Sequence, residues 1–336
     1  MINRNNTVLY AYSTDIDYFT YNEGTGNMIN YAYKYSTTAN VRFDTKQEEE
    51  IEYHTDKQSL SDSLDSHQPD PSLGYRNKTT GSNLYNVLKK FLNNGKVSLC
   101  GAQVFIAVKR YPDESDVSDI ISQLRANHVM VYIAVDSVPS GGTNSAILYE
   151  VSYQTNGYCA FATGDDLPWP ANKIWKILVE TSVFHSITQT IKLNILGGDS
   201  HCILFLSNNL QGFYWMTAVL QSPYQFLAQN FVVSGSGRIE IPAFNTPIPV
   251  GFEKLSQIAV TIQNHTLDSS FVSLNYTIEK PNGYYVYKYT SANYRHYGTE
   301  QTSSLWLNGS LSYKWTIDYH YNTDAPQIIE CRMYSH

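Results

Sequence analysis

Five Asn-X-Ser/Thr triplets are the residues of this 336-residue chain whose chemistry is easiest to name, because such triplets accept N-linked glycans. Glycans are attached only on the secretory route, so occupied triplets would mark an extracellular protein. In an Asn-rich chain the triplets could also arise by chance. Their asparagines are Asn5, Asn77, Asn264, Asn275 and Asn308.

Four cysteines form the second group with a chemistry of its own. Cys100 and Cys159 fall in the first half and Cys202 and Cys331 in the second, and this even split predicts one disulfide in each half. Both groups together predict a secreted glycoprotein. The alternative is a cytosolic protein with four buried thiols. The polar start of the chain lacks the apolar core of a signal peptide, so we expect either that numbering begins after processing or that secretion is wrong.

Catalytic constellations do not emerge from the sequence. A hydrolase needs a nucleophile, a base and an orienting acid, yet there is no Gly-X-Ser-X-Gly motif, no His-X-X-X-His and no Cys/His cluster with zinc spacing. The turn Ser140-Gly141-Gly142 could bind an anion, but it lacks the Lys and second Gly of a P-loop, and a tight strand-to-helix turn explains it. We therefore expect no enzyme activity and no cofactor.

Aromatic side chains gather near the C-terminus of the chain. Alternate residues of a strand face opposite sides, so Tyr285, Tyr287 and Tyr289 would line one face, with Trp306 and Trp315 on later strands. Exposed Tyr and Trp are typical of contact surfaces for proteins, and they also stack on sugar rings. The alternative is cross-strand aromatic pairing that only stabilises the sheet.

The composition limits which kinds of protein could position these residues. Charged residues make up 16% of the chain, below the usual value of about 25%, and there are 28 tyrosines, so we expect a polar, aromatic surface. A net charge of -7 without a Lys/Arg run argues against a nucleic-acid partner. No stretch reaches the roughly 20 apolar residues of a membrane span. The length predicts about two domains.

Residues 1–185 alternate short strand-like runs with helical patterns, which predicts a mostly parallel sheet covered by helices. The period of the apolar residues predicts helices at 82–92 and 117–127, and a third helix after residue 142 that carries Ile147, Leu148 and Val151. Residues 59–80 have no period and are expected to be a loop. A final helix is expected near residues 174–178. The expected strands are 8–13, 40–45, 50–55, 103–108, 129–135 and 158–163.

Residues 186–336 have a different texture, in which polar and apolar residues alternate without helical spacing. Eight or more short strands follow one another at about ten-residue intervals, with Gly-rich and Pro-Asn-Gly turns between them. This half is therefore expected to be an antiparallel β-sandwich. The predicted fold class is an α/β domain followed by an all-β domain.

The order of elements in the first half resembles a von Willebrand factor A domain. Residues 100–135 are similar to the central strand, helix and following strand of that family, and residues 139–163 are similar to a branch seen in secreted nematode proteins. The resemblance covers about residues 7–185. It implies a mostly parallel sheet with helices on both faces, and it leaves the β-sandwich without an assigned family.

The resemblance also implies a place for a divalent metal at the carboxyl ends of the strands. The family holds it with an Asp-X-Ser-X-Ser loop, a Thr from a second loop and an Asp from a third, and hard oxygen ligands suit Mg²⁺. In this chain the first loop has a different spacing, and the central strand ends in Lys109-Arg110, whose cations repel a metal. The degenerate site would be left with Asp15, Asp17, Thr79 and Thr80.

Three acids after Arg110 leave a second possibility open. Asp113, Glu114 and Asp116 could hold a metal in a shifted site. Their simpler role is to stabilise the positive end of the helix that begins near Ser115. We favour the helix role, so that no working metal site is expected.

These patterns predict a secreted, non-enzymatic structural or adhesive protein that binds protein partners and is able to assemble with itself into oligomers or fibres. Exposed sheet edges and aromatic faces would provide the contacts. The alternative is a carbohydrate-binding, lectin-like protein of recognition or defence that uses the Tyr/Trp face. Metal-dependent adhesion through the degenerate site is the third hypothesis.

Overall fold

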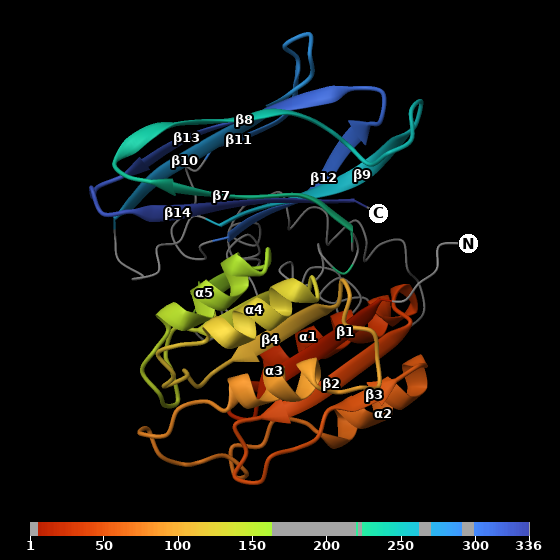
Figure 1. Ribbon diagram of the computed structural model, residues 1–336, viewed down its shortest axis with the longest axis vertical. Coiled ribbons are helices and arrows are strands. Elements are labelled where there is room, and N and C mark those ends of the chain that lie inside the picture. Colours follow the sequence, from red (N-terminus) through yellow and green to blue (C-terminus); the bar gives the residue numbers. More distant parts are fainter. Residues whose placement is uncertain (1–5, 163–219, 221–223, 262–269, 291–298, 336) are drawn as a thin grey trace, which may run out of the picture.

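The first half of the chain forms one six-stranded sheet in the computed structural model, with the strand order β3-β2-β1-β4-β5-β6 (Figure 1). Neighbouring strands run parallel, except that β3 is antiparallel to β2. The structure describes residues 6–162, 220, 224–261, 270–290 and 299–335. The strands are β1 (Thr7–Ser13), β2 (Thr37–Phe43), β3 (Glu52–His54), β4 (Gln103–Val108), β5 (Met130–Asp136) and β6 (Tyr158–Ala162).

Helices cover both faces of this sheet, as the sequence predicts. Helices α1 (Tyr18–Tyr31) and α2 (Lys57–Ser66) contribute to the core on one face. Helices α3 (Leu84–Leu92), α4 (Ser118–Ala126) and α5 (Ala146–Gln154) pack on the other. Helix α1 is followed by the short 3₁₀ turn η1 (Ala32–Lys34).

Helix α2 corrects the expectation that residues 59–80 form a loop throughout. The side chain of Asp56 accepts a hydrogen bond from the Ser59 backbone N–H at 2.9 Å and so caps the helix. Leu60 and Leu64, one turn apart, are fully buried against the sheet. Two leucines were too few to give a visible period among the Ser and Asp residues around them.

The two faces of the α/β sheet carry cores of different composition. On β1, Leu9 and Ala11 belong to an aliphatic core, whereas Tyr10 and Tyr12 point into a tyrosine-rich one. These phenols find partners: the Tyr12 hydroxyl, for example, donates to the His67 carbonyl at 2.8 Å. Many tyrosines are therefore buried, which corrects the expectation that they mainly form the surface.

The second half of the chain forms two four-stranded sheets packed face to face, which confirms the predicted sandwich (Figure 1). We call β11-β10-β13-β8 the outer sheet and β12-β9-β14-β7 the inner sheet, because the inner sheet faces the α/β domain. Paired strands are antiparallel. The strands are β7 (Tyr224–Val233), β8 (Ser236–Asn245), β9 (Glu253–Thr261), β10 (Phe271–Glu279), β11 (Tyr285–Thr290), β12 (Thr299–Asn308), β13 (Ser312–Tyr321) and β14 (Gln327–Ser335).

Strand β14 joins the two domains. Its residues Ile329, Cys331 and Met333 point into the sandwich core, so Glu330, Arg332 and Tyr334 point the other way, toward the α/β domain. The Arg332 side chain is fully buried there, and its Nε donates to the carbonyls of Asn156 at 2.9 Å and Gly157 at 3.2 Å. The Tyr334 ring lies 6.5 Å from that of Tyr132 on β5. The tyrosine-rich core therefore continues across the domain boundary.

The predicted boundary between residues 185 and 186 lies outside the described residues, as do the expected helix near 174–178 and the first strands of the sandwich. Within the described ranges, no helix is long and apolar enough to cross a membrane.

Candidate functional site

The carboxyl ends of the parallel strands meet at one edge of the α/β sheet, where such folds hold their ligands. There the Arg110 guanidinium, which follows β4, lies 3.1 Å from Oδ2 of Asp15, which follows β1. The same carboxylate oxygen accepts a hydrogen bond from the Ser140 hydroxyl at 2.8 Å. The Arg110 side chain is only 2% exposed. The charge of Arg110 is therefore neutralised by Asp15 inside the protein and does not face the solvent.

Arg110 also holds the loop that follows α2. Its Nη1 donates to the carbonyls of Asn77 at 2.8 Å and Thr80 at 2.7 Å, and the Tyr75 ring centroid lies 5.3 Å from the guanidinium carbon. A Cβ atom on Gly141 would overlap Nη1, so the glycine turn after β5 is needed to admit the guanidinium. One arginine thus ties together three loops at this edge.

Asp44, which follows β2, is a second buried acid at the edge. Its carboxylate accepts hydrogen bonds from the Ser13 hydroxyl at 2.6 Å, the Ser82 hydroxyl at 2.7 Å and the Asn83 backbone N–H at 3.0 Å. Burial raises the pKa of Asp44 to about 7, although these donors and Arg110 oppose the rise. The sequence interpretation missed Asp44. The signal was available, since an acid directly after a buried parallel strand lies at the ligand edge.

Lys109 and Asp136 form the other ion pair of the edge, with 2.5 Å between Nζ and Oδ2. Asp136 ends β5 and its side chain is 3% exposed, so Lys109 compensates a nearly buried charge. The carbonyl of Asp136 accepts a hydrogen bond from the Tyr111 hydroxyl at 3.0 Å. Each of the two cations after β4 therefore has a carboxylate of its own.

The predicted metal ligands do not converge on one point. Asp15 and the Thr80 carbonyl both contact the Arg110 guanidinium, whereas Asp17 accepts a hydrogen bond from the Thr20 backbone N–H at 2.8 Å and caps α1. The Thr79 N–H and hydroxyl both donate to the Asn77 side chain. Across the described residues, no group of three or more His, Cys, Asp or Glu side chains could hold a metal ion.

Of the three acids after Arg110, Asp116 lies at the start of α4. Asp116 accepts a hydrogen bond from the Ser118 backbone N–H at 2.9 Å, and this bond lowers the pKa of Asp116. That contact agrees with the helix-stabilising role. Asp113 is directed elsewhere and accepts a hydrogen bond from the Thr143 hydroxyl at 3.4 Å.

The cysteines correct the disulfide prediction. Cys100 is an exposed free thiol in the turn before β4, whereas Cys159 is a free thiol buried on β6 in the aliphatic core. They do not pair because the strand of Cys159 is separated from β4 by β5. Cys331 is also a free thiol, buried in the sandwich core, and Cys202 lies outside the described residues.

The glycosylation triplets have different environments. Asn77 is exposed in the loop that Arg110 holds, Asn308 is partly exposed at the end of β12, and Asn275 is partly exposed in the middle of β10. Asn5 and Asn264 lie outside the described residues. Attachment of a glycan at any of these positions stays a prediction.

The predicted aromatic face divides into buried and exposed residues. Trp315 is fully buried in the sandwich core, so its assignment to a contact surface was wrong. Tyr287 and Tyr289 lie beside the buried Tyr276, with ring centroids 5.8 and 5.1 Å away, which is the cross-strand pairing alternative. Tyr285 and Trp306 remain exposed, each by 60%.

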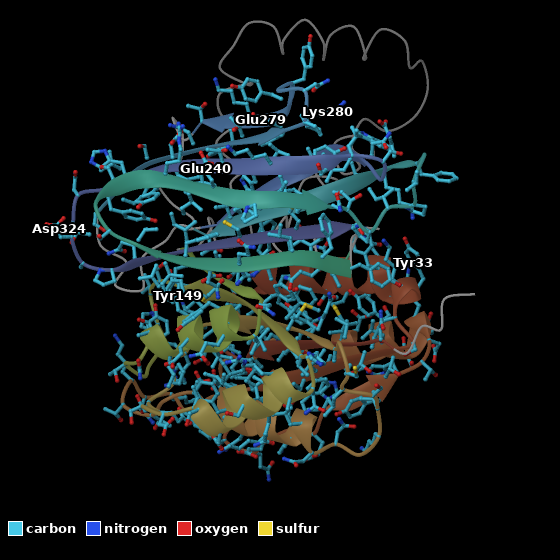
Figure 2. All side chains as sticks on the ribbon, turned by 45° about the horizontal axis from the view of Figure 1, so that its top comes forward. Tyr33, Tyr149, Glu240, Glu279, Lys280 and Asp324 are labelled. Atoms are coloured by element: carbon cyan, nitrogen blue, oxygen red, sulfur yellow. The ribbon has the colours of Figure 1, made fainter. Side chains whose placement is uncertain are left out.

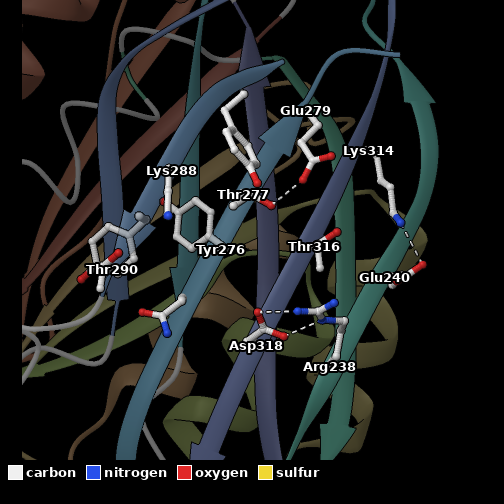
Figure 3. Close-up of a pocket in the computed structure, with 13 residues that line it drawn as sticks. Arg238, Glu240, Tyr276, Thr277, Glu279, Lys288, Thr290, Lys314, Thr316 and Asp318 are labelled. Atoms are coloured by element: carbon white, nitrogen blue, oxygen red, sulfur yellow. Dashed lines mark hydrogen bonds and ion pairs between the residues drawn. The ribbon is translucent and has the colours of Figure 1, made fainter. Parts of the chain in front are cut away.

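A polar hollow of about 530 Å³ lies on the outer sheet, on the face turned away from the α/β domain (Figure 3). We call it the outer-sheet hollow. Figure 2 shows Glu240 and Glu279 on this side, whereas Tyr149 lies on α5 beneath the inner sheet. The residues that line the outer-sheet hollow are Arg238, Glu240, Asn275, Tyr276, Thr277, Glu279, Tyr285, Lys288, Tyr289, Thr290, Lys314, Thr316 and Asp318.

A family profile described as "Domain of unknown function (DUF7154)" matches residues 229–336, which include most of the described sandwich. No curated protein matches the chain.

Solved structures that share fold features with the chain include proximal thread matrix protein 1 from the mussel byssus. It is 13% identical, with a TM-score of 0.33, over 48% of this chain and 44% of that one. A von Willebrand factor type A protein from Catenulispora acidiphila is 9% identical, with a TM-score of 0.36, over 95% and 58%. The human COPII-coat protein Sec24c is 8% identical, with a TM-score of 0.36, over 99% and 43%.

The chain thus spans about half the length of these solved structures. Such weak likenesses carry no argument about function. The fold class itself, a von Willebrand factor A-like α/β domain with an antiparallel sandwich, is confirmed by the strand order and the helices on both faces.

Proposed function

We propose that this chain is a secreted, non-enzymatic adhesive or structural protein that binds protein partners, copies of itself among them, through its sandwich. The α/β domain then serves as the scaffold. Its ligand edge supports this division, because Arg110 and Lys109 already neutralise Asp15 and Asp136 from within. The resemblance to secreted nematode proteins and the exposed triplet at Asn77 favour an extracellular place of action.

The exposed Trp306 is the observation that carries the proposal. It lies on β12, which has a neighbouring strand on one side only in the described inner sheet. Phe252, 63% exposed, is at the same end of the sandwich, because its carbonyl accepts a backbone hydrogen bond from Gly309 just after β12. Large exposed aromatic side chains beside an open strand edge are typical of protein contacts.

Concentration-dependent association tests this proposal. Sedimentation velocity of the full chain is expected to show oligomers that Trp306→Ser weakens by about tenfold or more, because interface tryptophans commonly contribute about 2 kcal/mol or more. Val232→Ser is the matched control, since Val232 is exposed on β7 at the opposite edge of the same sheet. A chain that stays monomeric at all concentrations and binds no extracellular matrix protein would contradict the proposal.

Carbohydrate recognition is the second candidate function. The outer-sheet hollow favours it, because polar and charged side chains line the hollow and Tyr285 supplies an exposed ring.

A further inference from the structure

The outer-sheet hollow exists because short side chains are surrounded by long ones. The register places Thr277 of β10 opposite Thr316 of β13, in the two central strands of the outer sheet. Around these two threonines lie side chains that are longer by several atoms, which are Arg238, Glu240, Glu279, Lys288 and Lys314. The volume of about 530 Å³ falls within the range of about 300–1,000 Å³ typical of small-molecule sites.

The charges of the hollow cancel. Three cations, Arg238, Lys288 and Lys314, meet three anions, Glu240, Glu279 and Asp318. Arg238 binds Asp318 through two hydrogen bonds of 2.6 and 3.0 Å. Figure 3 shows this pair and the Lys314–Glu240 pair, each joined by dashed lines. A charged ligand at Arg238 or Lys314 would have to break an ion pair, and the remaining charges, Lys288 and Glu279, offset each other, so a neutral ligand fits better.

The paired groups keep hydrogen-bonding capacity for a ligand. An ammonium has three donors, and Lys314 gives one of them to Glu240 at 3.0 Å. A carboxylate accepts about four hydrogen bonds, and Glu279 accepts one from the Thr277 hydroxyl at 3.2 Å. Donors and acceptors thus alternate over a small area. A ligand with several hydroxyl groups matches this pattern, because each hydroxyl both donates and accepts.

An aromatic ring is part of the lining as well. Tyr285 on β11 is 60% exposed, and the Lys288 ammonium lies 6.0 Å from its ring centroid. The apolar face of a tyrosine ring can cover the C–H face of a sugar ring while its hydroxyl stays in water. We propose that the outer-sheet hollow is a binding site for a neutral saccharide. The proposal rests on the second candidate function and gives it a place and a ligand class.

The full-length chain, produced in a secreting eukaryotic host, is to be applied to an array of neutral and acidic glycans, with affinities measured by calorimetry. Tyr285→Ala is expected to weaken binding of a neutral glycan by about tenfold, and Thr316→Tyr, which fills the floor of the hollow, to abolish it. Tyr284→Ala is the matched control, because Tyr284 is the 72% exposed neighbour that does not line the hollow. It should change the affinity by less than about twofold.

Three outcomes would overturn the proposal: no neutral glycan bound by a chain whose melting curve shows it folded, binding of acidic glycans only, or equal binding by wild type and Thr316→Tyr. A glycan of the chain itself on Asn275, found by peptide mass spectrometry, would also overturn it, because Asn275 lines the hollow. Loss of saccharide binding and loss of protein adhesion remain distinguishable, since Thr316→Tyr leaves Trp306 and its self-association unchanged.

Discussion

Arg110 stands at the edge of the α/β sheet about where the family resemblance implies a metal-binding carboxylate. It contacts the Asp15 carboxylate after β1 and the carbonyls of Asn77 and Thr80 in the next loop. A buried guanidinium needs partners for its donors, and here both Nη atoms contact oxygen atoms while the Tyr75 ring lies over the group, although Nε has no hydrogen-bond partner. Unlike a metal, this cation cannot dissociate, so the loops are joined permanently.

Removal of Arg110 should therefore destabilise the fold. Breaking a buried ion pair by removing one partner typically costs about 3–5 kcal/mol, so Arg110→Ala is expected to lower the free energy of unfolding by that amount. Arg238→Ala is the matched control, because the Arg238–Asp318 pair is 60% and 48% exposed and such pairs contribute about 0–1 kcal/mol. Urea denaturation measures both. Equal losses in the two variants would refute the buried-cation interpretation.

Among the elements, β14 carries two buried charged side chains, Glu330 and Arg332. Glu330 is fully buried, and its surroundings are Arg332 on the same strand, Cys159 on β6 and Tyr149 on α5. The Arg332 Nη2 atom lies 3.7 Å from Oε2 of Glu330, whereas Nε and Nη1 of Arg332 donate hydrogen bonds to backbone carbonyls. Burial raises the pKa of Glu330 to about 7, and Arg332 opposes the rise.

The pH dependence of stability should reveal Glu330. The folded chain keeps a proton on Glu330 up to about pH 7, whereas the unfolded chain loses it near 4.5. The free energy of unfolding should therefore fall as the pH rises between these values, because the native state binds more protons. Glu330→Gln is expected to make this fall shallower, as measured by urea denaturation at several pH values.

The raised pKa of Asp44 also makes the free energy of unfolding fall as the pH rises. The effect of Glu330 is therefore measured as the difference between the pH profiles of the wild type and Glu330→Gln. Glu240→Gln, at an exposed carboxyl, serves as the control. If the Glu330→Gln profile runs parallel to that of the wild type, Glu330 is not titrating in this window.

The sequence predicted elements whose own pattern was enough to define them. Strand β4 lies at residues 103–108 as expected, because an uninterrupted apolar run is typical of a central parallel strand. The alternating pattern did not extend to strand β14, since Glu330 and Arg332 look like surface residues until the α/β domain covers them. Trp315 was misplaced for the opposite reason, because alternation does not say which face of a strand is the core.

The candidate site was predicted only where one residue decided the matter. Because the central strand ends in Lys109-Arg110, the sequence predicted a cation at the ligand edge, and the structure places Arg110 there. The partners of that cation depend on loops brought together by the fold, and no local pattern pairs Arg110 with Asp15 or Ser140. The outer-sheet hollow depends on the register of four strands, which the sequence does not fix.

At the scale of the whole molecule, the tyrosine-rich core contains residues of both domains, so the sandwich is held in a fixed position on the α/β domain. Ala259 and Tyr334 of the inner sheet belong to the same cluster as Tyr132 and Tyr158 of the α/β sheet. The ligand edge and the outer sheet lie on different sides of this unit (Figure 1). Binding at the outer sheet would therefore not require the α/β edge to open.

Because Arg110 occupies the ligand edge of the α/β sheet, divalent metals should not change the stability of the chain. The melting temperature of the full chain is expected to stay the same with Mg²⁺, Mn²⁺, Ca²⁺ or EDTA, because a ligand raises it only by binding the native state. Arg110→Asp is the comparison, since it places a second carboxylate beside Asp15 and removes the cation. If the arginine alone keeps metals out, Mn²⁺ should raise the melting temperature of this variant. A rise for the unchanged chain would show instead that a metal site survives, and that adhesion through it has to be considered again.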